Sequence, residues 1–421
     1  MQNLQYIKDN MKKLNKHKLT IIPKYGDYYY PSTKVFEDDK GDVVFYGEQN
    51  EFPQHIIELY NKSSINGTAI SAKRDAVVGQ GLTTEDESIL EYANKEGESW
   101  NDIFKKVALD KVLFGGFALE IIWSNDRTKI AEVYHIDFSY VRAHKMNERG
   151  IIPGYYISSA FQNRGRLRIP KEDLTYIHRF NKLDRTSPSQ LIYAGNYEPG
   201  MRYYPLPDYN SGLNIISLDA EIDNFHKNNI KNGLAPSLSI TTFTNADNEE
   251  RGVIEQQLRE AYAGSDNAGS LIYMDVANKE EAPIITPIPQ NGADGYYTTV
   301  NDMVTQKILT SHRITSPMIL GIKTEGQLGG RTEMLEAFAH FQKTVIEPIQ
   351  SDILKEFEAI FKVNGMDITL GVETVRIFDD GDETEVITSI DEESGSDAIL
   401  EDGIEENIVN VQEKPKNEGI I

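Results

Sequence analysis

Two helical patterns on either side of a small unit of strands constrain the fold of this chain more than any other feature. The first pattern places four apolar residues at spacings of three, four and three, on one stripe of a helix: Ile215, Leu218, Ile222 and Phe225. The dipeptide Asn232-Gly233 then favours a helix end. The second pattern, Tyr296 to Ser311, predicts a helix whose inward face carries Val300, Met303, Val304 and Ile308.

The unit between these helices is too small to bury a core of its own. It spans about 55 residues and reads as strands at Leu238–Thr244, Ser270–Val276 and Pro283–Pro289, with a polar helix at Glu249–Ala263. Such a short segment removes little apolar surface from water. We therefore expect neighbouring copies of the chain to complete it.

The first two hundred residues predict a separate α+β region. Residues 1–45 are polar and turn-rich, which favours an extended arm. Phe52–Leu82 reads as a helix and a turn, and Trp100–Leu113 is amphipathic at helical spacing until Gly115 and Gly116 stop it. Strands are expected at Phe117–Trp123 and Lys129–His135, with further strand-like pieces as far as Ile177.

The C-terminal part contains a glycine-rich loop and the longest helical pattern of the chain. The loop, Arg313–Thr332, reads RITSPMILGIKTEGQLGGRT. The helix is expected over Glu333–Val363, with Thr332 as its N-cap, Asn364-Gly365 as its C-cap and a kink at Pro348. A strand over Asp367–Ile377 and an acidic, flexible tail from 379 to 421 complete the prediction.

The glycine-rich loop raises the possibility of a phosphate-binding loop, which the spacing disfavours. That motif requires G-x-x-x-x-G-K-[ST] after a strand. Here the first required glycine falls on Glu325, and the lysine is replaced by Arg331. Gly79 and Gly81 form only G-x-G, because the third glycine of a dinucleotide fingerprint falls on Thr84. A mobile loop and a turn are the favoured interpretations.

Charge and composition exclude several function classes. The formal net charge is −23, and the tail alone holds 15 acidic and 2 basic residues. A protein that grips nucleic acid needs a basic surface, which is not found. No apolar run approaches a membrane span and the N-terminus has no secretion signal. Without cysteine there is no disulfide, and a reducing cytosol is the simplest compartment.

We find no pattern that nominates a catalytic or metal site. The histidines do not form a zincin motif, and there is no G-x-S-x-G. The acidic run Asp379–Glu383 lacks the alternation and the final glutamate of an EF-hand loop. We therefore predict no catalytic residue, no metal ligand and no cofactor.

Six stretches between Asn50 and about Val363 are informative when they are taken in order. They read NEFPQHIIELYNKSSINGTAISAKRDAVVGQGL, WNDIFKKVALDKVLFGGFALEIIW, LTYIHRF, AEIDNFHKNNIKNGLAPSLSI, AYAGSDNAGSLIYMDV and ILTSHRITSPMILGI. No single stretch is specific, but their order over most of the chain is. In this order they make the chain resemble a portal protein of a long-tailed, double-stranded DNA bacteriophage.

The resemblance implies an α+β portal fold and a ring of twelve subunits at one capsid vertex. Its parts map onto this chain as follows: 1–209 arm and wing, 210–233 first stem helix, 234–291 clip, 292–313 second stem helix, 314–332 tunnel loop, 333–364 long kinked helix, 365–378 closing wing strand and 379–421 tail. After Ile377 no helical pattern of a crown follows, so the crown is absent or reduced to the end of the kinked helix.

The resemblance also implies which residues meet DNA and neighbouring subunits. The DNA-facing tunnel loop would contain Lys323, Gly326, Gln327, Gly329, Gly330 and Arg331, and the contacts between clips would include Leu271 and Tyr273. The implied partners are double-stranded DNA in passage, the terminase large subunit, the major capsid protein and a head–tail adaptor. The implied location is the virion, and the host cytoplasm during assembly.

Two other classes remain open at this point. One is another virion structural protein, of a tail or baseplate, which a count of subunits in purified particles would distinguish. The other is an enzyme that holds a nucleotide at Gly326–Thr332, which ATP hydrolysis by the pure chain would favour.

Overall fold

The computed structural model describes residues 35–37, 41–162, 169–231, 236–242, 253, 270–275, 293–321 and 331–374. The predicted polar helix at Glu249–Ala263, the strand at Pro283–Pro289 and the acidic tail lie outside these ranges, apart from residue 253. Of the predicted N-terminal arm, the described part contains two short strands. These strands, β1 (Phe36–Glu37) and β2 (Val44–Phe45), pair antiparallel.

The stretch Phe52–Leu82 was predicted as one helix followed by a turn, and the single helix was wrong, because the structure has two helices there. Helix α2 (Phe52–Lys62) ends at Ser63, whose backbone is extended with φ −91° and ψ 112°. The Ser63 hydroxyl accepts a hydrogen bond from the Asn66 amide and thereby caps α3 (Ser64–Val78). A serine that satisfies an otherwise unpaired amide favours a new helix start over continuation.

Helix α4 (Trp100–Phe114) begins and ends where the sequence predicted. Ser99 and Asp102 form a reciprocal capping box at its start. Gly115 ends it in the left-handed region at φ +79°. A Cβ at this position would lie 2.1 Å from the carbonyl oxygen of Leu206, so both the backbone angle and the close approach require glycine.

A six-stranded sheet forms the centre of the described fold. Its order is β5-β4-β9-β8-β7-β6, and all neighbours are antiparallel except β8 and β9. The strands are β4 (Gly116–Trp123), β5 (Ile130–Ile136), β6 (Val141–Ala143), β7 (Gly154–Ile157), β8 (Thr175–Arg179) and β9 (Ser189–Gly195). Short 3-10 turns lie along the same part of the chain: η1 (Glu87–Leu90), η2 (Phe138–Tyr140), η3 (Ser159–Gln162) and η4 (Lys171–Asp173).

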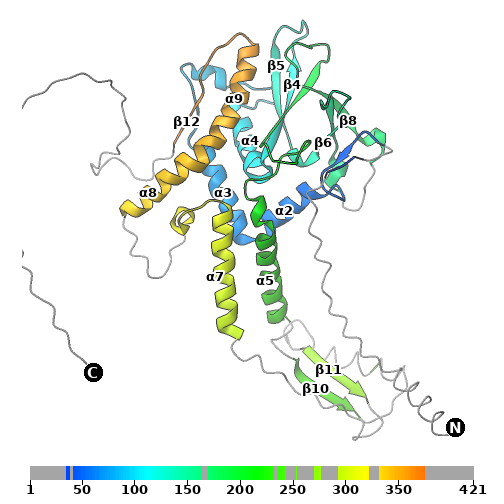
Figure 1. Ribbon diagram of the computed structural model, residues 1–421, viewed down its shortest axis with the longest axis vertical. Coiled ribbons are helices and arrows are strands. Elements are labelled where there is room, and N and C mark those ends of the chain that lie inside the picture. The colour runs from blue at the N-terminus through cyan, green and yellow to red at the C-terminus, as the bar shows by residue number, and fades with distance from the viewer. Residues whose placement is uncertain are drawn as a thin grey trace, which may run out of the picture. The chain divides into compact units, whose positions relative to one another are not determined.

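The long C-terminal helix packs on α4 through aromatic rings. Trp100 meets Phe361 with ring centroids 4.5 Å apart and Phe357 at 5.1 Å, and Phe104 also contacts Phe357. These four side chains are at most 5% exposed. The aromatic contact therefore holds α9 (Glu347–Val363) against the body. Figure 1 shows α9 running beside α4.

This helix contains an irregular turn that the sequence pattern did not predict. It consists of α8 (Arg331–Phe341), a π-helical turn at Gln342–Ile346 and α9 (Glu347–Val363). Pro348 is the second residue of α9, directly after the π turn, where its missing amide removes one helical hydrogen bond. The helix includes Thr332, so the prediction that Thr332 is its N-cap was wrong. Asn364 caps the C-terminus as predicted, and Gly365 follows at φ +81°.

The strand predicted over Asp367–Ile377 is much shorter in the described residues. Only β12 (Gly371–Glu373) is a strand, and it pairs antiparallel with β3 (Gly81–Thr83). The segment from 366 to 370 is not a strand.

Arg142 is the largest fully buried side chain in the described fold, and it has no acidic partner there. Its NH1 group donates to the Ser139 and Val141 carbonyl oxygens at 3.0 and 2.8 Å. Its NH2 group donates to the Asn50 carbonyl and to Gln54 Oε1, and its Nε donates to Asn50 Oδ1. Burial lowers the pKa of Arg142. Neutral acceptors thus satisfy every guanidinium donor, and they join α2 to β6 and η2.

Replacement of Arg142 by lysine should destabilise the fold, because an ammonium group cannot reach all of these acceptors. Each buried acceptor left without a partner costs about 1–3 kcal/mol, so we expect a loss of about 2–3 kcal/mol in the free energy of unfolding. Urea denaturation measures this loss. The matched control is Arg149→Lys at an exposed site, and equal midpoints for both variants would contradict the role assigned to Arg142.

Candidate functional site

The two helices predicted from the sequence lie side by side and antiparallel (Figure 1). They are α5 (Leu213–Lys231) and α7 (Ala293–Ser311), and the turn η5 (Asn210–Gly212) leads into α5. Gly212 permits a close approach at their base, since a Cβ there would lie 2.4 Å from the Ser311 hydroxyl.

The buried faces of these helices differ from the predicted stripes. On α5, Leu213 and Ile216 are fully buried and Ala220 nearly so, whereas Ile215, Leu218 and Ile222 only flank this face. The predicted stripe was therefore off by about one residue. On α7, Val304 and Ile308 are buried as predicted, but Met303 is 44% exposed, which contradicts the inward position assigned to it.

Between α5 and α7 the structure describes one pair of strands by its backbone alone. Strand β10 (Pro236–Thr242) pairs in parallel with β11 (Ser270–Asp275). The register places Leu271 opposite Leu238 and Tyr273 opposite Ile240. The strand predictions at Leu238–Thr244 and Ser270–Val276 are thus confirmed to within two residues at each end.

Buried polar contacts fasten the base of the helix pair to the body. The Ser63 hydroxyl donates to Asp219 Oδ2 at 2.6 Å, which joins the α2–α3 junction to α5. Burial raises the pKa of Asp219, although this hydrogen bond acts in the opposite direction. The Tyr209 hydroxyl donates to the Leu113 carbonyl oxygen at 2.8 Å, from the segment before α5 to the end of α4.

His312 makes the corresponding contact for α7. Its Nε2 lies 2.9 Å from Asn66 Oδ1, and its ring stacks on Tyr209 at 4.4 Å between centroids. The amide oxygen can only accept, so Nε2 carries the proton of a neutral imidazole. Burial, and next the positive charge of Lys73, hold the pKa of His312 well below its usual value. Lys73 is itself buried and pairs with Asp208. Periodicity could not identify these polar anchors, because Asn66 and Lys73 lie on the buried face of α3, where the pattern expects apolar side chains.

The chain leaves α7 through a Schellman turn centred on an arginine. The Arg313 amide donates to the Thr310 carbonyl, and the Ile314 amide donates to the Leu309 carbonyl. Arg313 adopts φ +60°, a conformation that usually selects glycine. The buried side chains of Leu309 and Ile314 supply the apolar contact that accompanies this turn. The direction of the following loop is therefore fixed at its first residue.

A second contact holds the start of the loop to the long helix. Arg313 NH2 donates to the Thr344 carbonyl oxygen in the π turn at 2.7 Å. A π turn misaligns backbone carbonyls, which makes such an external donor useful. After Ile314 the chain forms the 3-10 turn η7 (Pro317–Leu320), capped by the Ser316 hydroxyl, and Gly321 ends it at φ +74°.

Most of the loop residues predicted to face DNA lie outside the described ranges. These are Lys323, Gly326, Gln327, Gly329 and Gly330. Arg331 is the first residue of α8, and its side chain is not described. The loop follows a helix and a 3-10 turn rather than a strand, which further disfavours a phosphate-binding loop. Gly79 and Gly81 form a turn against β12, since a Cβ on Gly79 would lie 2.2 Å from the Glu373 carbonyl.

Two searches of the described residues give negative results. No group of histidine, aspartate and glutamate side chains there is arranged to hold a metal ion. Among the described helices, none has the length and apolarity needed to cross a membrane.

Stability should fall in acid partly because of His312. Its folded-state pKa is depressed, so the unfolded chain binds its proton more readily below pH about 6.5. The contribution of His312 to the free energy of unfolding is at its full value above that pH. As the pH falls below it, this contribution decreases by at most about 1.4 kcal/mol per pH unit. His312→Gln should flatten the curve of unfolding free energy between pH 6.5 and 4.5, and His178→Gln at an exposed site is the control. A slope unchanged by His312→Gln would refute this assignment.

Comparisons with known proteins support the fold. No protein-family model matches the sequence, and no curated protein matches it. A chain from the virion of a native gene transfer agent particle is 13% identical with a TM-score of 0.53, covering 79% of this chain and 86% of its own. A chain from the neck of an empty gene transfer agent particle, computed with C6 symmetry, is 14% identical with a TM-score of 0.53, covering 78% and 85%. An HK97 family phage portal protein from Corynebacterium diphtheriae is 8% identical with a TM-score of 0.45, covering 75% and 95%.

The two likenesses at a TM-score of 0.53 cover more than three quarters of this chain and show a shared fold. The chain therefore shares its α+β fold with these two chains of gene transfer agent particles.

Proposed function

We propose that this chain is a portal protein that forms a ring at one capsid vertex, through which double-stranded DNA is packaged and ejected. One observation carries the proposal. The antiparallel helices α5 and α7 flank a strand pair in the sequence, and α7 leads into a glycine-rich loop, in a fold shared with a particle neck. In this assignment α5 and α7 are the stem, residues 234–291 the clip and 314–332 the tunnel loop. The body is the wing, the long helix with Pro348 runs along it, and a crown is absent or reduced.

Ring formation is supported by surfaces that a single copy leaves incomplete. The strand pair β10–β11 has two outer edges that no other described strand covers. Parallel sheets are normally covered on both faces, and two strands alone are marginally stable. Met303 on α7 is also exposed. Contacts of one copy with different surfaces of the next close into a ring, and the related neck was computed with C6 symmetry. A ring of twelve, as in portal proteins, contains that sixfold symmetry.

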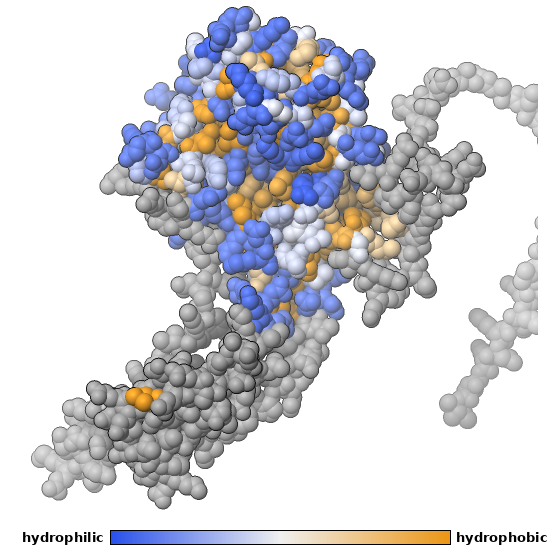
Figure 2. All heavy atoms as spheres, turned by 180° about the vertical axis from the view of Figure 1, so that it is seen from behind, coloured by the Kyte–Doolittle hydropathy of each residue, from blue (hydrophilic) through white to orange (hydrophobic). Residues whose placement is uncertain are grey.

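The charge of the chain suits a channel that DNA must pass without binding tightly. The formal net charge is −23, and from behind Figure 2 shows mostly hydrophilic side chains over the described surface. A negative wall repels phosphates over a Debye length of about 8 Å at physiological salt. One Lys323 from each subunit would add a ring of positive charges, with Arg331 a second contributor. Gly326, Gln327, Gly329 and Gly330 would let the loop follow the duplex.

In this proposal the chain is a structural protein with no cofactor, and the motor chemistry belongs to a separate terminase. The clip would dock the terminase large subunit and later a head–tail adaptor, and the wing would contact the major capsid protein. The protein would be found in the virion, and in the host cytoplasm during assembly.

The purified chain should form rings that electron microscopy and native mass spectrometry can count. We place Leu271 and Tyr273 at contacts between clips. Leu271→Asp and Tyr273→Asp should therefore prevent ring formation, since an unpaired charge in an apolar interface costs several kcal/mol.

Leu183→Asp is the matched control, because Leu183 is 88% exposed on the wing. A chain that stays monomeric at micromolar concentration in all salts would overturn the portal proposal. Normal rings with both clip substitutions would overturn only the placement of these two residues.

The loop has a test of its own. Lys323→Glu should leave ring assembly intact but lower the amount of DNA packaged or retained, measured as nuclease-protected DNA per particle. Gly329→Val together with Gly330→Val should have the same effect, because β-branched residues disfavour positive φ.

Lys105→Glu provides the control, at a lysine that is 61% exposed on α4. Normal packaging and retention in both loop variants would refute the role of the loop, and would leave the ring itself unaffected.

A further inference from the structure

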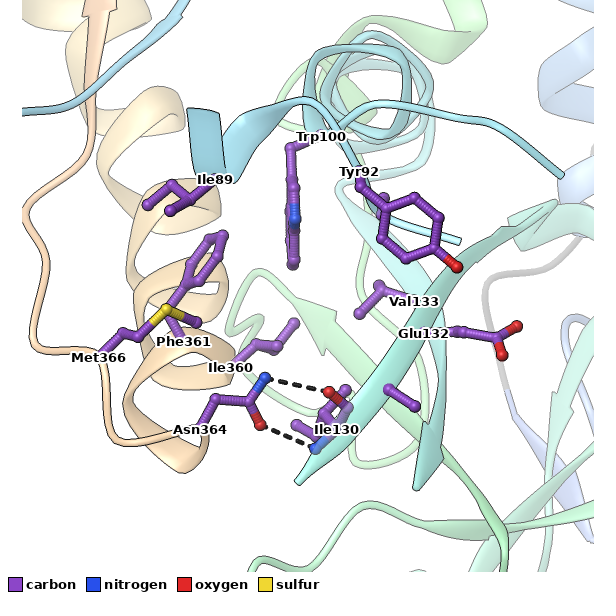
Figure 3. Close-up of a pocket in the computed structure, with 12 residues that line it drawn as sticks. Ile89, Tyr92, Trp100, Ile130, Glu132, Val133, Ile360, Phe361, Asn364 and Met366 are labelled. Atoms are coloured by element: carbon purple, nitrogen blue, oxygen red, sulfur yellow. Dashed lines mark hydrogen bonds between the residues drawn. The ribbon is translucent and has the colours of Figure 1, made fainter. Parts of the chain in front are cut away.

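An apolar pocket opens on the body at the edge of the sheet formed by β5. Figure 3 shows its lining, which comes from η1, the start of α4, strand β5 and the end of α9: Ile89, Trp100, Val133, Ile360, Phe361 and Met366. Asn364 closes one end, where its side chain bonds both the amide and the carbonyl of Ile130 at 2.7 and 3.0 Å. Tyr92 also lines the pocket and is 54% exposed. A large aromatic side chain that is half exposed beside an apolar pocket is typical of a contact surface.

The segment that carries Ile89 and Tyr92, on one side of the pocket, is rich in acidic residues. Between Glu85 and Glu98 the chain has six acidic residues and a single lysine. The lysine pairs with Glu132, and Glu98 pairs with Lys106. The ion pairs among the described residues do not include four exposed carboxylates of this segment: Glu85, Glu87, Glu91 and Glu96. The pocket therefore selects a segment that combines apolar side chains with positive charge.

The chain itself contains such a segment, outside the described residues. Residues 1–34 carry seven lysines and two acidic residues, in a protein whose net charge is −23. Apolar residues recur among these lysines at spacings of three, four and three: Leu4, Ile7, Met11 and Leu14. Residues 1–34 therefore have a net charge opposite to that of the acidic segment beside the pocket. They also contain the apolar side chains that could fill it.

The point where residues 1–34 join the body and the pocket lie at opposite edges of the sheet. Residues 1–34 join the body at β1, which pairs with β2, and Val43 next to β2 bridges to His144 just after β6. Strand β6 is one edge of the six-stranded sheet and β5 is the other. Five inter-strand spacings of about 4.8 Å separate them along the sheet. Thirty-four residues can span at most about 110 Å, which is ample to reach a neighbouring molecule.

We propose that residues 1–34 of one copy bind the acidic, apolar pocket beside β5 of a second copy. The point where residues 1–34 join the body and the pocket lie at different edges of the sheet. Each partner therefore uses a different surface, and the contact is heterologous. Repeated contacts of this kind close into a ring. The inference rests on the proposed ring and adds a second contact between subunits, separate from the clip.

Site-specific photo-cross-linking tests this contact in the full-length chain. A photoreactive phenylalanine derivative replaces Tyr92, and the control position is Tyr197, which is 87% exposed. Chains labelled with ¹⁵N and unlabelled chains are mixed in denaturant and refolded together before irradiation. We expect peptides from residues 1–34 to be cross-linked to position 92, with heavy and light peptides joined, and not to position 197.

The outcomes separate this inference from the ring. Rings without a cross-link from position 92 to residues 1–34 would overturn the inference and leave the ring. Cross-links only within one chain would also overturn it, because the segment would then bind its own pocket. Heavy–light cross-links in a chain that forms no closed rings would support the contact and overturn the ring.

Charge reversal gives an independent test. Replacing Lys12, Lys13 and Lys16 by glutamate should lower the cross-linking yield by about fivefold to tenfold. This estimate assumes that three exposed ion pairs are lost, each contributing about 0.3–0.5 kcal/mol to binding. Replacing Glu85, Glu87 and Glu91 by lysine should do the same, and the two sets of changes together should restore the yield. Failure of the combined variant to recover, with its fold intact by circular dichroism, would refute the charge pairing.

Discussion

Hydrogen bonds between buried polar groups hold the helix pair to the body, and the rest of the described structure depends on them. A helix that projects from a body can bury apolar side chains only near its base, as Leu213 and Ile308 do. The contacts Ser63–Asp219 and Asn66–His312 add direction, because each hydrogen bond joins specific atoms of two buried side chains. An apolar contact alone would allow the helices to slide. The base therefore fixes where the chain leaves α7 and enters the loop.

Local patterns in the sequence predicted those elements whose ends are set by local chemistry. Helix α4 lies between Ser99 and Gly115, and both residues act within a turn of the helix end. The break at Ser63 was missed because the apolar pattern continues through it. The π turn does correspond to a feature of the sequence. Apolar residues recur there at four consecutive intervals of four residues: Phe341, Val345, Ile349, Ile353 and Phe357. Such a series drifts around an α-helix, and a wider turn corrects the drift.

The candidate site was less predictable, since its anchors act between segments far apart in the chain. Nothing near Asn66 in the sequence indicates a contact with His312, 246 positions away. Arg313 in a left-handed conformation contradicts the usual preference for glycine, and its bond to Thr344 depends on where α8 and α9 pack. The loop residues from Lys323 to Gly330 were assigned by family resemblance, and they remain a prediction. Burial of Met303 was wrongly predicted because periodicity identifies a face but not what covers it.

The close approach at Gly115 has a mechanical consequence. The backbone of Leu206 and Pro207 lies directly over Gly115, which has no side chain to separate the two main chains. The rigid ring of Pro205 lies over Gly116 and Gly195. Side chains absorb small displacements by changing rotamers, whereas touching main chains have no such freedom. A tilt of α5, which begins a few residues later, is therefore resisted by the sheet itself. The junction is therefore rigid, and a force applied to α5 is transmitted to β4 with little deformation of the contact.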